Sequence, residues 1–180
     1  MKDQLPFPIA VRPWDELSER DRNFFSFGDD YLPLHPNHAA QIGLLVSADA
    51  DRLTEWADSA MPPGWPDRTG RRRFEREELL SVYNCWNDAD RRSEVRRWLF
   101  DRGIPLSRTV YLLYERHRVV QTTWRMVVRY WDAFARSVGY AMDAVDHTLQ
   151  WACCFHHENV ILFGSHIPEE QRNIHPHFSS

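Results

Sequence analysis

The pattern of apolar positions in the second half of the chain predicts one helix and several strands. An unbroken apolar stripe at the i, i+3, i+4, i+7 spacing of a helix face is formed by Trp124, Val127, Val128, Trp131, Ala135 and Val138. Runs of β-branched and aromatic residues predict strands at 108–115, 142–149, 151–156 and 160–166. The polar turn at 157–159 joins the last two strands into an antiparallel hairpin.

The first half of the chain predicts an extended arm at 5–13 and then helices separated by loops. Helices are expected from Ser18, at 37–46, from Ser47 to Ala60, at 74–86, and from Asp88 or Asp90 to Gly103. The prolines of 61–70 forbid regular structure, so this segment is a loop. We therefore expect an α+β fold: a helical N-terminal half, then a small, mainly antiparallel sheet of three or four strands with the long amphipathic helix packed on one face.

Length and composition suit one folded domain. The chain has 180 residues, of which 43% are hydrophobic and 27% are charged, and these are ordinary values for globular proteins. Because no repeat, low-complexity tract or long linker divides the chain, we expect a single domain at 1–180. The N-terminal arm at 1–13 and the tail at 167–180 are expected to be peripheral.

Several features favour a cytoplasmic protein. The longest apolar stretches, such as 160–163, are far shorter than the roughly twenty residues of a membrane span. The N-terminus lacks the apolar stretch of a signal peptide. The three cysteines, Cys85, Cys153 and Cys154, form no C-x-x-C motif, and the plain interpretation is buried, reduced thiols.

The charge pattern gives no indication of a nucleic-acid partner or a membrane partner. The formal net charge is −4, whereas nucleic-acid binders usually carry a basic excess on one face. Basic clusters at 71–73, 91–92 and 96–97 are interleaved with acidic residues. This interleaving is typical of solvated helix faces.

The histidines raise the question of a metal site. The densest group of candidate ligands is His147, His156, His157, Glu158 and His166. The sequence leaves open whether these side chains converge, although His156 and His157 cannot both face one metal if they lie on a strand. A zinc site needs three or four converging ligands, and no H-E-x-x-H motif occurs. We expect no metal.

Catalytic and cofactor motifs are also missing from the sequence. Cys153 and Cys154 lie between apolar residues, which favours inert thiols over a nucleophile. No P-loop, G-x-G-x-x-G or G-x-S-x-G motif occurs, so we expect no cofactor. The alternative that stays open is a small metal-dependent or nucleophilic hydrolase that uses the neighbourhood of His157 and Glu158.

One loop has the composition of a protein–protein contact. Trp65 lies among prolines and is followed by Arg68, Arg71, Arg72 and Arg73. Tryptophan and arginine are the residues that most often anchor interfaces, so these five residues are the candidate partner-binding residues. The other interpretation is that Trp65 folds back to cap the core, because large aromatic side chains are mostly buried.

A resemblance connects the second half of the chain to a known class of binding proteins. Residues 111–164 run Tyr-Leu-Leu-Tyr-Glu, a turn, Val-Val-Gln-Thr-Thr-Trp, an aromatic-rich helix, Trp151, and His157-Glu158 followed by Ile161 and Gly164. This region loosely resembles small bacterial α+β immunity proteins of the SUKH type. The resemblance implies a non-enzymatic cytoplasmic protein that neutralises a cognate protein toxin by direct contact. It supplies no catalytic residues, and the oligomeric state stays open.

Overall fold

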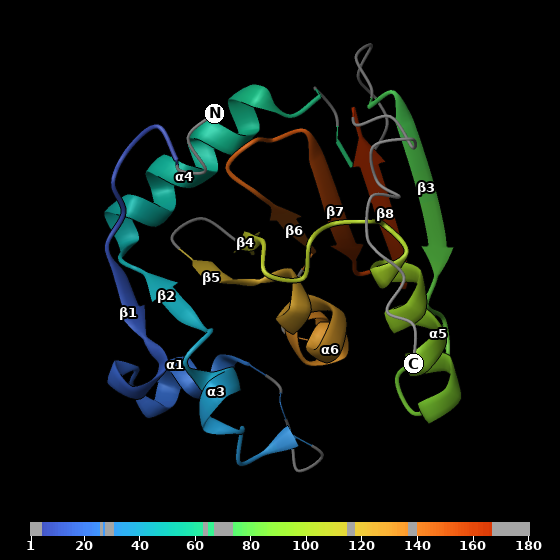
Figure 1. Cartoon of the computed structure of the whole chain (residues 1–180), viewed down its shortest axis with the longest axis horizontal. Helices are drawn as coiled ribbons and strands as arrows, with labels where there is room; N and C mark the ends of the chain where they lie inside the picture. The colour runs from blue at the N-terminus through green and yellow to red at the C-terminus, as the bar shows by residue number, and fades with distance from the viewer. Residues whose placement is uncertain are drawn as a thin grey trace.

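The computed structural model describes residues 5–25, 27, 31–62, 65–66, 74–114, 118–136 and 140–166. Within them, one antiparallel sheet has the strand order β1-β2-β5-β4-β6-β7-β8-β3 (Figure 1). The strands are β1 Val11–Pro13, β2 Gly43–Leu45, β3 Arg76–Ser81, β4 Thr109–Leu113, β5 Val119–Thr123, β6 Ala141–Val145, β7 Trp151–His156 and β8 Val160–Ser165.

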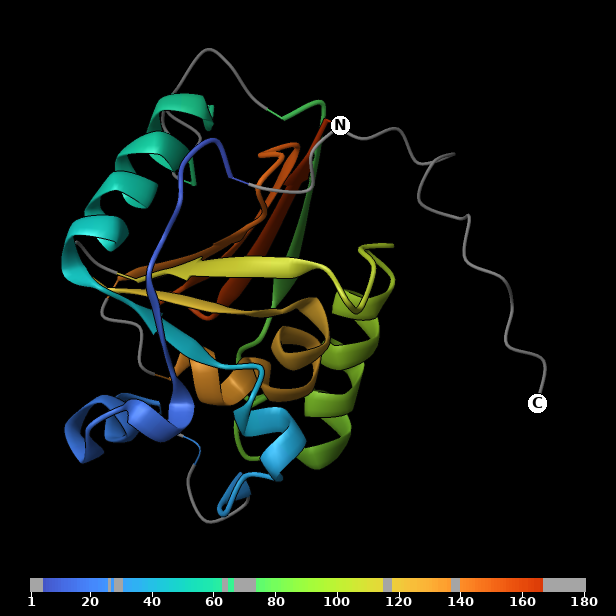
Figure 2. The same cartoon turned by 60° about the vertical axis from the view of Figure 1, so that its left-hand side comes forward.

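Helices cover both faces of this sheet. They are the short 3-10 helix η1 Trp14–Glu16 and the α-helices α1 Glu19–Phe24, α3 Pro36–Ala39, α4 Ser47–Ala60, α5 Ala89–Phe100 and α6 Trp124–Ala135. Figure 2 shows the sheet between α4 (teal) on one side and the neighbouring helices α5 (yellow-green) and α6 (gold) on the other. The molecule therefore has a helix layer, a sheet layer and a second helix layer.

The expectation of a helical N-terminal half and a sheet of three or four strands is wrong. The first half contributes β1, β2 and β3 to the sheet, and β5 forms at 119–123, where no strand was expected. The two edges of the sheet, β1 and β3, both come from that half. The short helix α3 ends at Ala39, so the expected helix at 37–46 is replaced by α3 and β2.

Strand length explains why β1 and β2 were missed. Each has three residues, whereas a period-2 alternation needs at least four residues to be recognised. β1 pairs with β2, and β2 pairs with β5. Gly43 permits the close approach of β1, because a Cβ atom at that position would overlap the Val11 side chain.

β3 was missed for a different reason. Its sequence, Arg-Glu-Glu-Leu-Leu-Ser, consists mostly of residues with high helix propensity. Nevertheless all six residues pair with β8 in antiparallel register, and strand pairing overrides a weak local preference. Charged residues suit this position because they discourage an edge strand from pairing with other chains.

The alternating residues of the central strands separate two cores. On β4, Val110 and Leu112 face the α5–α6 side, whereas Tyr111 and Leu113 face α4, as the period of two requires. The predicted α6 stripe is confirmed at the positions that are fully or almost fully buried, namely Trp124, Val127 and Trp131. Val138 lies outside the described residues.

The smaller core belongs to α4 and the extended arm. The helix buries Ala50, Leu53 and Ala57, and the arm adds Leu5, Phe7, Ile9 and Val11, which pack against the same cluster. None of the helices in the described part of the chain is long and apolar enough to cross a membrane.

Candidate functional site

A polar hollow of the described surface lies between α3, α5, α6 and the segment that begins at Tyr31. It has a volume of about 810 Å³. Its walls include Tyr31, His38, Arg96, Arg125, Arg129 and Tyr130, and we call it the arginine cleft. Arg96 comes from α5, whereas Arg125 and Arg129 come from α6.

The amphipathic pattern of α6 places two of these arginines. Arg125 and Arg129 are four residues apart, so they lie on one helix face as neighbours. The apolar stripe of α6 is turned to the sheet, and both arginines are therefore exposed on the opposite side. Among the described residues, neither Arg125 nor Arg129 forms an ion pair with a carboxylate.

Arg96 is held in place by hydrogen bonds. Its Nε donates to the Arg129 carbonyl oxygen at 3.2 Å, and its Nη2 donates to the Tyr31 hydroxyl at 3.1 Å. The Tyr31 hydroxyl in turn donates to the Asp132 carboxylate at 2.8 Å. Asp132 is only 1% exposed and also pairs with Arg92 at 3.5 Å. This buried carboxylate therefore orients the back wall of the cleft.

The electrostatic surroundings set the protonation of two groups in the wall. Burial raises the pKa of Tyr31, and the hydrogen bond to Asp132 raises it further. Partial burial lowers the pKa of His38, and the positive charge of Arg129 adds to this effect. His38 is therefore neutral at pH 7, because its ordinary pKa of 6.5 already lies below that value.

An interruption of α6 shapes the cleft floor. Tyr130 has φ −119° and ψ 26°, which is not helical, and its hydroxyl lies 2.7 Å from His38 Nδ1. The Tyr130 ring packs edge-on against Phe27 and Tyr31, with ring centres 5.5 and 5.1 Å apart. The Arg129 guanidinium lies 5.5 Å from the centre of the same ring. These contacts fix α3 to α6.

The arrangement is suited to binding an anionic group. Arginine presents planar, bidentate donors that match carboxylates and phosphates. Three arginines give the cleft a formal charge of +3, although the whole chain carries −4. The cleft is thus positively charged, although the protein as a whole has a negative net charge.

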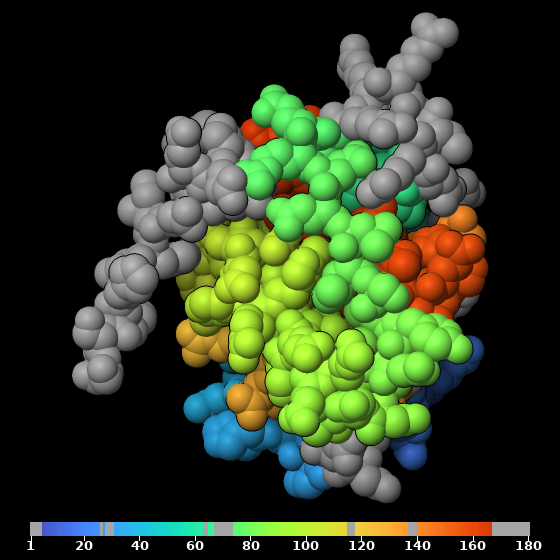
Figure 3. All heavy atoms as spheres, turned by 90° about the vertical axis from the view of Figure 1, so that its right-hand side faces the viewer, coloured from blue at the N-terminus to red at the C-terminus, as the bar shows by residue number. Residues whose placement is uncertain are grey.

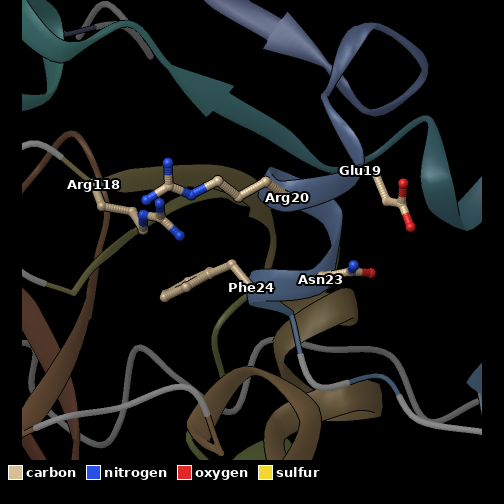
Figure 4. A pocket seen from close by; sticks show the side chains of 5 residues that line it. All are labelled: Glu19, Arg20, Asn23, Phe24 and Arg118. Carbon is tan, nitrogen blue, oxygen red and sulfur yellow. The ribbon is translucent and has the colours of Figure 1, made fainter.

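Another hollow lies on α1 (Figure 4). The Arg118 guanidinium lies 4.0 Å from the centre of the Phe24 ring, and Figure 4 shows Arg20 and Arg118 extending toward one another. The Phe24 ring packs edge-on against Tyr114 with centres 4.9 Å apart. This hollow therefore presents two cations beside an aromatic surface.

The histidines of the predicted group do not converge. β7 pairs with β8 so that His156 is opposite Val160 and Trp151 is opposite Ser165. His166 lies next to Gln150, at the opposite end of the hairpin from His156, roughly 20 Å away at about 3.3 Å per residue. His147 lies in the β6–β7 connection, at the same end as His166. The part of the chain that the structure describes contains no group of three or more His, Cys, Asp or Glu side chains placed to hold a metal ion.

The cysteines are buried and unbridged, as the sequence predicts. Burial raises the pKa of the Cys153 thiol far above its usual value, and the nearby Asp143 adds to the shift. Burial also raises the pKa of Cys85. A raised pKa keeps a thiol protonated, which makes it a poor nucleophile.

Trp65 is half-buried against the sheet. Its indole Nε1 donates to Asp143 Oδ1 at 3.0 Å, and its ring packs edge-on against Phe74 with centres 5.0 Å apart. Arg68, Arg71, Arg72 and Arg73 lie outside the described residues. Partner binding by these five residues remains a prediction, and the contacts of Trp65 give its side chain a structural role as well.

The arginine cleft was not identified from the sequence. The interleaved charges around Arg96 are typical of a solvated helix face, and the apolar stripe of α6 indicates no role for Arg125 and Arg129. The one sequence feature that indicates a shared surface is the i, i+4 spacing of Arg125 and Arg129 on the helix face opposite that stripe. The contributions of His38 and Tyr31 come from distant segments, so only the tertiary structure brings them together.

Comparison with protein-family models, with curated proteins and with solved structures finds no match to this chain. The likeness of residues 111–164 to SUKH-type immunity proteins therefore remains an expectation from sequence. Because one fold can host many functions, the function of this chain follows from the residues of its site.

Proposed function

We propose that this chain is a non-enzymatic binding protein of the bacterial immunity type, which neutralises a protein toxin in the cytoplasm by direct contact. The arginine cleft receives an acidic segment of that toxin. The observation that carries the proposal is the pair Arg125 and Arg129. Both are exposed on one face of α6 and have no carboxylate partner among the described residues.

The composition of the cleft supports a protein partner. Arginine and tyrosine are among the residues enriched at the energetic centres of interfaces, and the cleft combines Arg96, Arg125 and Arg129 with Tyr31 and Tyr130. Arg96 and Tyr31 are already held by hydrogen bonds that end on Asp132. A wall that is ordered before binding loses little conformational freedom when a partner docks.

Charge supports an acidic partner. Because Arg125 and Arg129 are exposed, they steer association and fix the register of an incoming carboxylate. Attraction of this kind weakens with added salt, since exposed charges are screened beyond about 8–10 Å. We expect affinity for the toxin to fall as ionic strength rises.

Growth protection tests the proposal. The reading frame adjacent to this gene is expressed from an inducible promoter in a bacterial host, with and without this protein, and surviving colonies are counted. We expect the neighbouring product to stop growth and the wild-type protein to restore it. A neighbouring product that is harmless, or a toxicity that this protein leaves unchanged, contradicts the immunity function.

Matched variants locate the contact. An Arg125→Glu, Arg129→Glu variant should fold normally and lose protection. Arg97→Glu makes the same kind of charge change on an exposed position of α5 outside the cleft, so it should protect like wild type. A Trp65→Phe, Arg72→Ala variant tests the loop. If it alone loses protection, the loop is the interface and the cleft is not.

A further inference from the structure

A further cavity, separate from the arginine cleft and from the hollow on α1, lies where α6 meets the terminal hairpin. Its volume is about 270 Å³. The residues that define it are Val82, Trp86, Trp131, Phe155, His156 and Ile161, with Arg136 at its margin, and we call it the aromatic pocket. Figure 3 shows that the segment after β3 (green) lies beside the β7–β8 hairpin (orange-red), and the Val82 N–H donates to the Asn159 carbonyl there at 2.7 Å.

The walls of the aromatic pocket are rigid. The Trp86 and Trp131 rings are 5.2 Å apart, and Trp131 is fully buried. The Trp86 indole Nε1 donates to Asn159 Oδ1 at 2.9 Å, which ties the tryptophan to the hairpin turn. The pocket therefore exists before any ligand binds, as is usual for small-molecule sites.

His156 brings an unpaired polar atom to this apolar surrounding. Its side chain is 8% exposed, and its Nε2 has no hydrogen-bond partner among the described residues. Its Nδ1 accepts from the Glu158 backbone N–H at 3.4 Å. The proton of the neutral ring is therefore on Nε2, and a protonated ring also carries one there. A buried donor without an acceptor is unfavourable and requires an explanation.

Arg136 supplies a positive charge to the lining of the same pocket. The residue is exposed, and its Nη2 donates to the Trp86 carbonyl at 3.2 Å. A guanidinium has five N–H donors, so others are available for a ligand. The pocket thus combines aromatic walls, one buried donor and one cation at the margin.

We propose that the aromatic pocket binds a small aromatic carboxylic acid. The ring of the ligand lies against Trp86, which covers the buried Trp131, and its carboxylate accepts from His156 Nε2 and Arg136. The pocket, at about 270 Å³, is slightly smaller than the roughly 300–1,000 Å³ of sites for drug-sized ligands, so its size agrees with a smaller ligand of one or two rings. This site does not depend on the arginine cleft or on toxin binding.

Phenylacetate is the probe for the first experiment. Binding is measured by calorimetric titration and by quenching of tryptophan fluorescence, and phenylacetamide serves as the uncharged analogue of the same shape. We expect saturable binding of phenylacetate at one site and at least fivefold weaker binding of phenylacetamide. Equal binding of the two compounds, or no saturation with phenylacetate, overturns the proposal.

Variants distinguish this pocket from the other basic surface. His156→Phe and Arg136→Gln should each weaken phenylacetate binding at least fivefold, and His156→Gln, which restores a side-chain donor, should recover part of the loss. Arg129→Gln removes a charge from the arginine cleft and should leave binding unchanged. Loss of binding in Arg129→Gln with retention in Arg136→Gln places the acid in the cleft and refutes the pocket. Circular dichroism checks the fold of each variant, and Arg136→Gln decides alone if His156→Phe unfolds.

Discussion

The Trp65 indole and the Asp143 carboxylate, which are 78 positions apart in the chain, are joined by a hydrogen bond of 3.0 Å. Asp143 lies on β6, and the bond ties the proline-rich loop to the sheet. Burial raises the pKa of Asp143 from 3.8 to about 6, although the hydrogen bonds from Trp65 and Cys154 act in the opposite direction. The structure therefore holds a carboxyl group that resists ionisation.

This raised pKa predicts how stability depends on pH. Between about pH 4 and pH 6, the folded state binds more protons at Asp143 than the unfolded state does. The free energy of unfolding should therefore fall as pH rises through this window, and the contribution should be constant above it. Asp143→Asn keeps an oxygen that accepts from Trp65 and has no charge to bury. We expect the variant to gain about 1–3 kcal/mol at pH 7.5, measured by urea denaturation at several pH values. If the free energies of unfolding of wild type and variant change in parallel with pH, the raised pKa of Asp143 is contradicted.

Trp65→Ala should lower stability by about 2 kcal/mol, because it removes a half-buried aromatic ring and leaves Asp143 without its indole donor. Chemical denaturation measures the loss. Arg72→Ala serves as a separate variant, so that an effect on partner binding is not confused with an effect on folding. A Trp65→Ala protein as stable as wild type means that the loop is not held by these contacts.

Trp131→Ala should cost roughly 3–5 kcal/mol, the range for deleting a buried large aromatic side chain. Trp131 has no exposed surface and packs on Trp86. Phe100→Ala is the control, because Phe100 is 56% exposed at the end of α5 and should change stability by less than about 1 kcal/mol. Similar denaturation midpoints for the two variants exclude a central role for Trp131.

Gly164→Ala should destabilise the protein by about 1–3 kcal/mol. A Cβ atom at this position of β8 overlaps the Phe74 ring, and that ring is also in contact with Trp65 and His166. A double-mutant cycle tests the cause: in a Phe74→Leu background, the same substitution should cost measurably less. Additive effects of the two substitutions show that the overlap is not the reason.

The sequence predicted those elements whose local pattern agrees with their tertiary environment. Ser18 accepts a hydrogen bond from the Asp21 N–H at the start of α1, as its spacing indicates. The α6 stripe and the β7–β8 hairpin are also present. In each case the deciding interactions lie within a few residues or within one periodic face.

The residues of the arginine cleft, in contrast, could not be predicted from local sequence patterns. His38, Arg96 and Tyr130 line one cleft only because α3, α5 and α6 meet on the same side of the sheet. Local periodicity carries no information about which helix faces which, so these residues were indistinguishable from other surface positions. The separation of His156 from His166 is likewise a property of strand register.

By itself, the sequence determined the amphipathic helix α6, the terminal hairpin, the burial of the three cysteines and the mixture of helices with antiparallel strands. Only the tertiary structure decided that β1, β2 and β3 complete the sheet and that three arginines share a cleft. The physical reason is that helix stripes and strand alternation are encoded over short stretches. Edge strands such as β3 are stabilised instead by pairing with a distant partner, here β8, and this long-range pairing overrides the helix propensity of their own residues.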